Sequence, residues 1–349
     1  MRISVCIPTY NRAVELVDLL DSIVQQRDFG FDLEVVVSDN ASEDGTYDVV
    51  QRYRDQIPGL VYSATSSNIG ADRNFLRSVE LASGDYCWLI GSDDKYEPGA
   101  FARIGAILDK YGADLRLSGV SVAARGYGPD LREVSQASDP LMEKLRDVTF
   151  MEDKDRILST VGVGFGFLSS LVVNRNRWNH VVATYPVSDH FNVYVHVYVV
   201  ANIIDVYPRW VCVPERLVGY RGGNDSFLGN GRFNRMRIDV MGYLSVFRSV
   251  LEPHEYSYRV IVDELLRLHV YNHVKTAKLA SEGSAFWKQA FELLMPRFRG
   301  HPAFWWKVMP VMLTPAPVIR GAYRLVRMVR DRQGRDGPDT VAERAGDQG

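Results

Sequence analysis

Two adjacent carboxylates, Asp93 and Asp94, follow an apolar run that begins at Tyr86 and ends at Ile90. A strand that is buried on both faces of a parallel sheet has such a continuous apolar sequence. In open α/β sheets, ligands bind beyond the carboxyl ends of the strands. Carboxylate oxygens there suit a hard divalent cation, which in turn binds a diphosphate. Aspartate and serine also favour turns, so the pair taken alone equally suits an ordinary strand-ending turn.

Strand-like and helix-like patterns alternate through the first hundred residues. We expect strands at 3–7, 33–37, 60–64 and 86–90, and amphipathic helices at 14–24, 46–57, around 75–79 and at 98–112. This alternation predicts an α/β fold with a mostly parallel sheet flanked by helices. Right-handed crossovers bring all these strand ends to one edge, where Thr9, Asp39, Asn68 and the two carboxylates meet. The alternative is that polar residues simply end strands, as they do in many proteins.

Composition limits the classes of protein. The 349 residues allow one large α/β domain with an appended part, or two domains. A formal net charge of −2 argues against a dedicated nucleic-acid-binding protein. Cys6, Cys87 and Cys212 lie in apolar runs without metal-ligand spacing, so we expect buried thiols in a reducing compartment. The first strand begins almost at once and no signal-like segment opens the chain, which predicts a cytoplasmic protein.

Four short motifs follow one another through the first third of the chain: Ile7–Arg12, Val37–Thr46, Asn68–Gly70 with Arg73–Asn74, and Gly91–Asp94. In this order they resemble the family 2 glycosyltransferases, which have the GT-A (Rossmann-like) fold. Gly91–Asp94 together with Gly222–Phe227 is similar, more narrowly, to abequosyltransferase-like enzymes of bacterial surface-polysaccharide assembly. The resemblance implies a metal-dependent, inverting transfer of a hexosyl or deoxyhexosyl group. The donor would be a nucleotide sugar and the acceptor a glycan or lipid-linked glycan.

The resemblance also implies that residues of the first three motifs contact the donor: Pro8, Thr9, Tyr10, Asp39, Asn68 and Arg73. Pro8 and its two neighbours would wall the nucleobase, Asp39 would bind the base or its ribose, and Arg73 would lie near the nucleotide. Asp93 would contact the ribose or the metal, and Asp94 would coordinate Mg²⁺ or Mn²⁺ between the two phosphates. Many members carry another acidic residue where this chain has Gly91, so metal binding would then rest on Asp94, phosphate and water. Mg²⁺ accepts one or two carboxylates.

The middle of the chain offers a general base and a further donor contact. Family members place an acidic base near the start of a helix in this region, and Asp189 is our candidate, with His190 second. Equally, Ser188 or Asp189 only caps that helix, and a packed histidine is the more ordinary role for His190. Arg221, in the polar segment 220–226, is a candidate to reach the diphosphate and close the site, although an ordinary surface loop is as good an interpretation.

Three other segments carry simpler expectations. We expect a fifth strand at 115–124 and a loop at 125–145. The small-residue run 161–170 lacks the helix that a nucleotide-binding glycine loop requires. Its glycines suit either close approach to the acceptor or tight packing.

The C-terminal third is helical in pattern. We expect a GT-A domain at 1–230, with halves at 1–115 and 116–230, a helical region at 231–330 and a disordered tail at 331–349. Within 286–330, aromatic residues at 304–306 precede arginines at helical spacing, namely Arg320, Arg324, Arg327 and Arg330. Aromatics with a basic amphipathic helix predict peripheral contact with the anionic inner face of the cell membrane. The alternative is a helix docked on the domain with a solvated basic face.

Two other functions compete with glycosyl transfer. A sugar-phosphate nucleotidyltransferase has a similar sheet but requires a glycine-rich, basic loop after its first strand, which residues 8–12 do not supply. A non-catalytic protein that binds nucleotide sugars, or acts as a scaffold at the membrane, is compatible with Gly91 and with the unusual base motif. The sequence names neither the nucleobase, the sugar, the acceptor nor the oligomeric state.

Overall fold

The computed structural model describes residues 1–26, 30–112, 116–132, 134 and 141–335, with side chains as far as residue 325. The chain divides into two compact units. The first comprises Met1–Gly229 and Val240–Val262, and the second comprises Asn230–Asp239 with the described residues from Asp263 onward.

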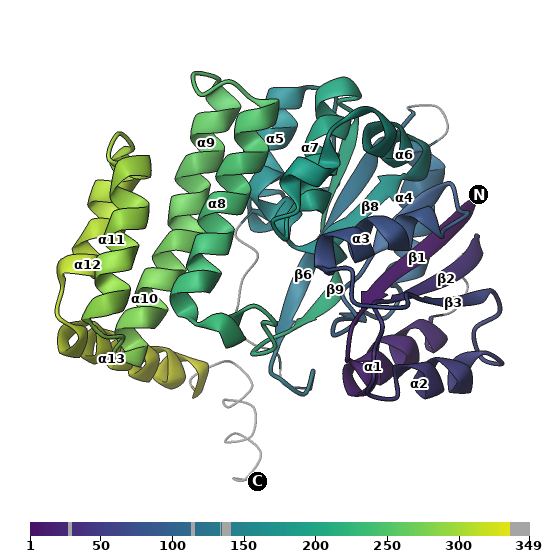
Figure 1. Ribbon diagram of the computed structural model, residues 1–349, viewed down its shortest axis with the longest axis horizontal. Helices are drawn as coiled ribbons and strands as arrows, with labels where there is room; N and C mark the ends of the chain where they lie inside the picture. Colours follow the sequence, from purple (N-terminus) through teal and green to yellow (C-terminus); the bar gives the residue numbers. More distant parts are fainter. Residues whose placement is uncertain (27–29, 113–115, 133, 135–140, 336–349) are drawn as a thin grey trace, which may run out of the picture. The chain divides into compact units, whose positions relative to one another are not determined.

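In the described part of the first unit, nine strands form one sheet (Figure 1). The strands are β1 (Arg2–Thr9), β2 (Asp32–Asp39), β3 (Leu60–Ala64), β4 (Tyr86–Leu89), β5 (Lys95–Tyr96), β6 (Gly119–Tyr127), β7 (Thr149–Met151), β8 (Leu171–Asn174) and β9 (Trp210–Arg221). Their order is β3-β2-β1-β4-β8-β6-β9-β5, with β7 paired to β9. The first four are parallel, as the alternation predicts. Beyond them β8 runs antiparallel to both β4 and β6, while the long β6–β9 ladder is again parallel.

Helices connect and cover these strands. The α-helices that begin in the first unit are α1 (Ala13–Val24), α2 (Thr46–Tyr53), α3 (Ala71–Glu80), α4 (Ala100–Tyr111), α5 (Lys154–Val161), α6 (Arg175–Thr184), α7 (Val195–Val206) and α9 (Tyr256–Glu264). Figure 1 shows α1 and α2 on one side of the β1–β3 edge and α3 on the other. The helix expected at 46–57 stops at Tyr53, and the strand expected at 115–124 begins at Gly119 and runs on to Tyr127. The loop expected at 125–145 falls partly outside the described residues.

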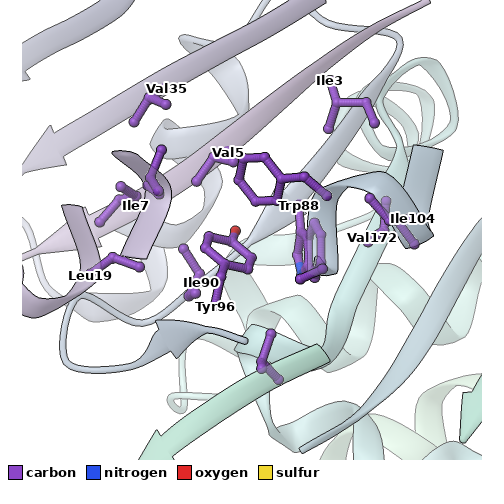
Figure 2. Close-up of a cluster of buried hydrophobic side chains, with 14 of the residues drawn as sticks. Ile3, Val5, Ile7, Leu19, Val35, Trp88, Ile90, Tyr96, Ile104 and Val172 are labelled. Atoms are coloured by element: carbon purple, nitrogen blue, oxygen red, sulfur yellow. The ribbon is translucent and has the colours of Figure 1, made fainter. Parts of the chain in front are cut away.

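The core under the first strands is built from alternate residues of the sheet. Ile3, Val5 and Ile7 of β1 face the same cluster as Val35 and the indole of Trp88, with α1 and α4 packed over them (Figure 2). Trp88 is fully buried, and its ring centroid lies 4.6 Å from that of Tyr96. The Trp88 indole N–H also donates to the Ser169 carbonyl at 3.1 Å. The strand that leads to Asp93 and Asp94 is therefore fixed by packing and by this hydrogen bond.

Cys6, Cys87 and Cys212 are all buried free thiols, as expected. The run 161–170 forms two short 3-10 turns, Gly162–Gly166 and Leu168–Ser170. A Cβ atom at Gly166 would lie 1.9 Å from the Tyr243 hydroxyl oxygen, so glycine there allows close packing.

The second unit is helical. It contains the start of α8 (Arg232–Val250), then α10 (Tyr271–Ala280), α11 (Ser284–Phe298), α12 (Met309–Leu313) and α13 (Ala316–Arg335), with π-helical segments at Leu265–Val270 and Phe304–Val308. A buried carboxylate, Asp239, lies between Arg235 and two histidines, and its Oδ2 is 2.7 Å from His273 Nε2. In the described part of the chain, no helix combines the length and apolarity needed to cross a bilayer. The side chains of Arg327 and Arg330, and the tail from 336, lie outside the described residues.

Candidate active site

The ends of β1 and β2 form the first part of the site. Thr9 and Asp39 are register partners at the last position of the two strands. The Asn40 backbone N–H donates to the Thr9 carbonyl at 2.9 Å, so the chain stays paired where the two strands end. Thr9 is 2% exposed, and its hydroxyl has no hydrogen-bond partner. A buried hydroxyl without a partner is costly, and a bound ligand is one way to satisfy it.

Asp39 is engaged on both carboxylate oxygens. Its Oδ2 accepts from the Tyr62 hydroxyl at 2.6 Å, and its Oδ1 accepts from the Ser42 backbone N–H at 2.9 Å. The side chain is almost wholly buried. Burial together with the Asp39 charge raises the pKa of Tyr62, so the phenol stays protonated and continues to donate. Asp39 is thus a fixed acceptor at the end of β2.

Asn68 joins this edge through Asn40, whose side-chain N–H donates to Asn68 Oδ1 at 3.0 Å. Asn40 also accepts the Ile69 backbone N–H at 2.8 Å. Tyr10 and Asn68 are exposed next to these fixed groups. Arg73, also exposed, places its guanidinium carbon 5.2 Å from the centre of the Phe191 ring.

Asp94 is also buried, at 6% exposed. Its Oδ2 accepts from the Ser169 hydroxyl, and its Oδ1 accepts from the Arg221 backbone N–H at 3.1 Å. Ser169 is itself oriented by the Gly91 backbone N–H, which donates to its hydroxyl oxygen at 2.9 Å. Burial, with the negative charge of Asp93, raises the pKa of Asp94 to about 7. Burial also raises the pKa of Asp93, against the opposing charges of Arg12 and Arg221.

Asp93 is more open, with 26% of its side chain exposed. Arg12 Nη1 lies 3.8 Å from Asp93 Oδ2, and the Asn224 side-chain amide donates to the same oxygen at 3.1 Å. Arg12 also donates to the Asn224 carbonyl at 3.4 Å. The segment after β9 therefore reaches the carboxylate pair.

Arg221 is enclosed, with 8% of its side chain exposed. Its guanidinium donates to Asp18 Oδ2 at 2.6 Å, to the Pro129 carbonyl at 2.6 Å and to the Asp93 carbonyl at 3.0 Å. Arg221 thus lies beside the carboxylate pair with its N–H groups directed at protein acceptors. Its contact with a diphosphate stays a prediction.

Asp189 and His190 lie in a 3-10 turn, Val187–His190, ahead of helix α7. Asp189 is exposed, whereas His190 is buried and stacks on Tyr198 with ring centroids 3.9 Å apart. Burial lowers the pKa of His190. Neither Ser188 nor Asp189 caps α7, because the Asp72 carboxylate of α3 accepts the N–H groups of Val193 and Val195 at the start of that helix.

Several groups of the site were not assigned a role from sequence. Arg12 lies within the first motif, and Ser169 lies within the small-residue run. The sequence therefore drew attention to both segments, but it did not show which residues they contact. Asn224 lies within the motif Gly222–Phe227, whereas Glu15 had no such signal. Their contacts join residues that are far apart in the chain, as in the 3.5 Å hydrogen bond from the Asn224 amide to Glu15 Oε1.

Comparison with known proteins decides the family. A family model described as Glycosyl transferase family 2 matches residues 4–169. Abequosyltransferase RfbV of Salmonella typhimurium is 36% identical over 255 residues, which cover 70% of this chain and 74% of that protein. The chain belongs to glycosyltransferase family 2. This membership confirms the expected enzyme class and counts against the nucleotidyltransferase alternative.

Solved structures of other glycosyltransferases share the fold. Residues 1–349 of TarS from Staphylococcus aureus, in complex with UDP-GlcNAc, match with a TM-score of 0.57 and 17% identity, over 93% of this chain and 92% of that one. The mannosyltransferase PcManGT from Pyrobaculum calidifontis, in complex with GDP-Man and Mn²⁺, matches with a TM-score of 0.54 and 19% identity, over 91% and 86% of the two chains. At these identities the likeness is one of fold, and it confirms the GT-A-like α/β architecture.

Proposed function

We propose that this family 2 glycosyltransferase moves a sugar, with inversion, from a nucleotide-sugar donor to a glycan or lipid-linked glycan during assembly of a bacterial surface polysaccharide. The observation that carries the proposal is the Asp93–Asp94 pair at the end of β4, beside the β1 and β2 ends that hold Thr9 and Asp39. The similarity to an abequosyltransferase supports a glycan acceptor. The exposed Tyr10, Asn68 and Arg73 complete the proposed donor contacts.

The carboxylate pair fits a divalent cation, Mg²⁺ or Mn²⁺. The negative charge of Asp93 raises the pKa of Asp94, and a positive ion at the pair would relieve this repulsion. Among the described residues no group of three or more His, Cys, Asp or Glu residues is arranged to hold a metal. Asp94 and Asp93 would therefore hold the ion, and phosphate and water would complete its coordination. A bound cation would act as a Lewis acid toward the leaving diphosphate, a contribution of several kcal/mol.

The absence of a side chain at position 91 has a steric basis. A Cβ atom at this position would lie 3.0 Å from Asp93 Oδ1 and 3.3 Å from Asp94 Oδ2. A side chain here would push on both carboxylates. The hydroxyl of Ser169 donates to Asp94 and supports it in this chain.

Asp189 is the proposed general base. The acceptor hydroxyl must lose a proton as it attacks the sugar. Asp189 is exposed and is not used as a helix cap, whereas His190 is buried and stacks on Tyr198. The contact of Arg73 with Phe191, two residues beyond Asp189, supports a location next to the donor edge.

We further propose that the segment 286–330 binds the anionic inner face of the cell membrane. Its described residues expose large apolar side chains, namely Phe291, Trp305, Trp306, Leu313, Val318, Tyr323 and Leu325. Arg320 and Arg324 accompany them on α13. Aromatic and basic residues together favour the interface of an anionic bilayer.

Thermal unfolding with a panel of nucleotide sugars tests the donor site. UDP-GlcNAc, GDP-mannose and CDP- and dTDP-linked sugars are compared, each with Mn²⁺, Mg²⁺ or EDTA. A ligand that binds only the folded protein raises its stability in a concentration-dependent way. We expect one nucleotide class to stabilise the protein only with metal, and to release nucleoside diphosphate on incubation. Asp94→Asn should abolish the metal-dependent rise, and Asp48→Asn, an exposed control on α2, should keep it.

Two outcomes would contradict the proposal. Stabilisation that EDTA leaves unchanged would remove the metal assignment. Stabilisation without turnover against a broad acceptor panel would favour the non-catalytic alternative.

Flotation with vesicles of phosphatidylglycerol and phosphatidylcholine tests the membrane proposal. Binding should be lost in the Trp305→Ser/Trp306→Ser double variant and kept in the control Val14→Ser.

A further inference from the structure

The chain turns sharply between Asp189 and helix α7, and Val193 stands at this turn. Its φ is +78°, in the left-handed region. A β-branched residue rarely adopts this conformation, because its Cβ substituents crowd the backbone. Such strain persists only where the surrounding structure imposes it, and it gathers at functional sites. The turn at Val193 therefore needs a group that holds it.

The Asp72 carboxylate in the first turn of α3 is that group. Its Oδ2 accepts the Val193 backbone N–H at 2.8 Å, and its Oδ1 accepts the Val195 backbone N–H at 3.1 Å. Asp72 is 8% exposed, and each of its carboxylate oxygens accepts one of these two backbone N–H groups. Helix α7 begins at Val195 without a side-chain cap of its own. A simple helix cap would need only the Val195 bond, whereas the bond to Val193 acts on the strained residue ahead of the helix.

The same turn of α3 holds the chain on the other side of Val193. The Arg73 guanidinium lies over the Phe191 ring, and the Asn192 backbone N–H donates to the His190 carbonyl at 2.8 Å. The residues just after Asp189 are thus attached to the start of α3. That helix begins at Ala71, three residues after Asn68, and Asn40 ties Asn68 to the edge that holds Asp39.

We propose that Asp72 is a positioning residue for glycosyl transfer: by holding Val193 in its left-handed conformation, it sets the turn that presents Asp189 to the acceptor. This inference rests on the proposed role of Asp189 as the base. Asp72 itself is buried with both oxygens engaged, so it holds the turn and takes no proton from the acceptor.

A double-mutant cycle tests the inference, with Asp72→Asn and Asp189→Asn made singly and together, and Asp48→Asn as the matched control. Asn has the shape of Asp, but one of its terminal atoms is a donor and cannot accept from Val193 or Val195. We expect Asp72→Asn to lower kcat for nucleoside diphosphate release from the panel's nucleotide sugars at least tenfold, and to change the donor KM less than twofold. In the Asp189→Asn background the same change should alter kcat less than twofold, because residues that act as a unit are not additive.

Hydrogen exchange gives a readout that needs no ligand. The amides of Val193 and Val195 should exchange at least tenfold faster in Asp72→Asn than in the Asp48→Asn control. If Asp72→Asn alone does not fold, the cycle is run with Val193→Gly in all four proteins, since glycine adopts this turn without strain.

The outcomes distinguish the positioning role of Asp72 from the proposed role of Asp189 as the base. If Asp72→Asn lowers kcat by the same factor with and without Asp189, its effect is structural and the inference is wrong. Unchanged kcat or unchanged amide exchange in Asp72→Asn also overturns it. If Asp189→Asn retains full turnover, the base assignment fails first, and the positioning role fails with it.

Discussion

Proton binding at Asp94 should compete with the divalent cation, so metal-dependent affinity for the nucleotide sugar should rise with pH up to about 7 and then level off. The cause is local. Burial and the charge of Asp93 raise the pKa of Asp94 from 3.8 to about 7. A metal binds the ionised carboxylate, so each proton on Asp94 removes a ligand.

The size of the effect follows from that pKa. About one-tenth of Asp94 is ionised at pH 6 and about nine-tenths at pH 8, so the apparent affinity should be about tenfold weaker at pH 6 than at pH 8. Ser169→Ala removes the hydroxyl that favours the ionised form. One hydrogen bond of about 1 kcal/mol corresponds to somewhat less than one pKa unit, so the midpoint in Ser169→Ala should move upward by that amount.

The stability of the metal-free protein should change in the opposite sense. With a raised pKa, folded Asp94 keeps a proton that unfolded Asp94 has lost between pH 4 and 7. The contribution of Asp94 to the free energy of unfolding therefore falls as pH rises through this window. Asp94→Asn removes the dependence, and it should make the metal-free protein more stable at pH 8, by at most about 4 kcal/mol for a shift of about three units.

Calorimetric titration of the nucleotide sugar with Mn²⁺, from pH 5.5 to 8.5, measures the first effect. A nucleotide sugar is preferred to a nucleoside diphosphate, whose terminal phosphate also titrates in this range. Thermal unfolding of the metal-free wild type and Asp94→Asn over the same range measures the second. A flat affinity profile, or a metal-free Asp94→Asn protein that is less stable than the wild type at pH 8, would refute this account of Asp94.

Three other substitutions probe the groups that support the site and the second unit. Trp88→Ala removes a fully buried indole and should lower the free energy of unfolding in urea by about 3–5 kcal/mol; a loss below about 1 kcal/mol would contradict the packing. Asp239→Asn removes the buried negative charge that pairs with the half-buried Arg235 and should lower the free energy of unfolding at pH 7 by about 1–3 kcal/mol, measured by thermal unfolding. Since the pKa of Asp239 lies well below 3.8, mainly through its bonds to histidine, that difference should persist to about pH 4 and shrink only in stronger acid. Tyr62→Phe removes one hydrogen-bond donor to Asp39, so it should lower the free energy of unfolding by about 1–3 kcal/mol and weaken the stabilisation by nucleotide. An unchanged thermal response to nucleotide would exclude Asp39 from the donor site.

The early strands and helices were predictable because their signals are local. Apolar runs predicted the first four strands to within one or two residues at each end, whereas the helix expected at 46–57 ended four residues early, at Tyr53. Helix α3 is the instructive exception. Its apolar residues include Phe75, Leu76 and Val79, yet its buried residues are Asp72, Asn74, Ser78 and Val79. Polar residues are buried there because partners from other segments satisfy them, as when Asn74 donates to the Thr9 and Ser38 carbonyls.

The site shows the same contrast between local sequence signals and contacts with distant segments. The motifs predicted that Thr9, Asp39 and the two carboxylates share one edge, since parallel strands with right-handed crossovers leave no other arrangement. They did not predict that Ser169 would support Asp94, or that the side chain of Arg221 would be enclosed by protein acceptors. No local pattern records such pairs.

The sequence by itself determined the order of strands and helices, the carboxylates at a strand end and the resemblance to family 2. Only the tertiary structure decided which polar groups complete the site: Asp94 with partners 75 and 127 residues away, and Val193 with an acceptor 121 residues away. The physical reason is the separation along the chain over which each kind of interaction acts. Periodicity and turn chemistry act between residues a few positions apart, whereas a buried carboxylate is stabilised by whatever donors the packed chain brings within about 3 Å of it.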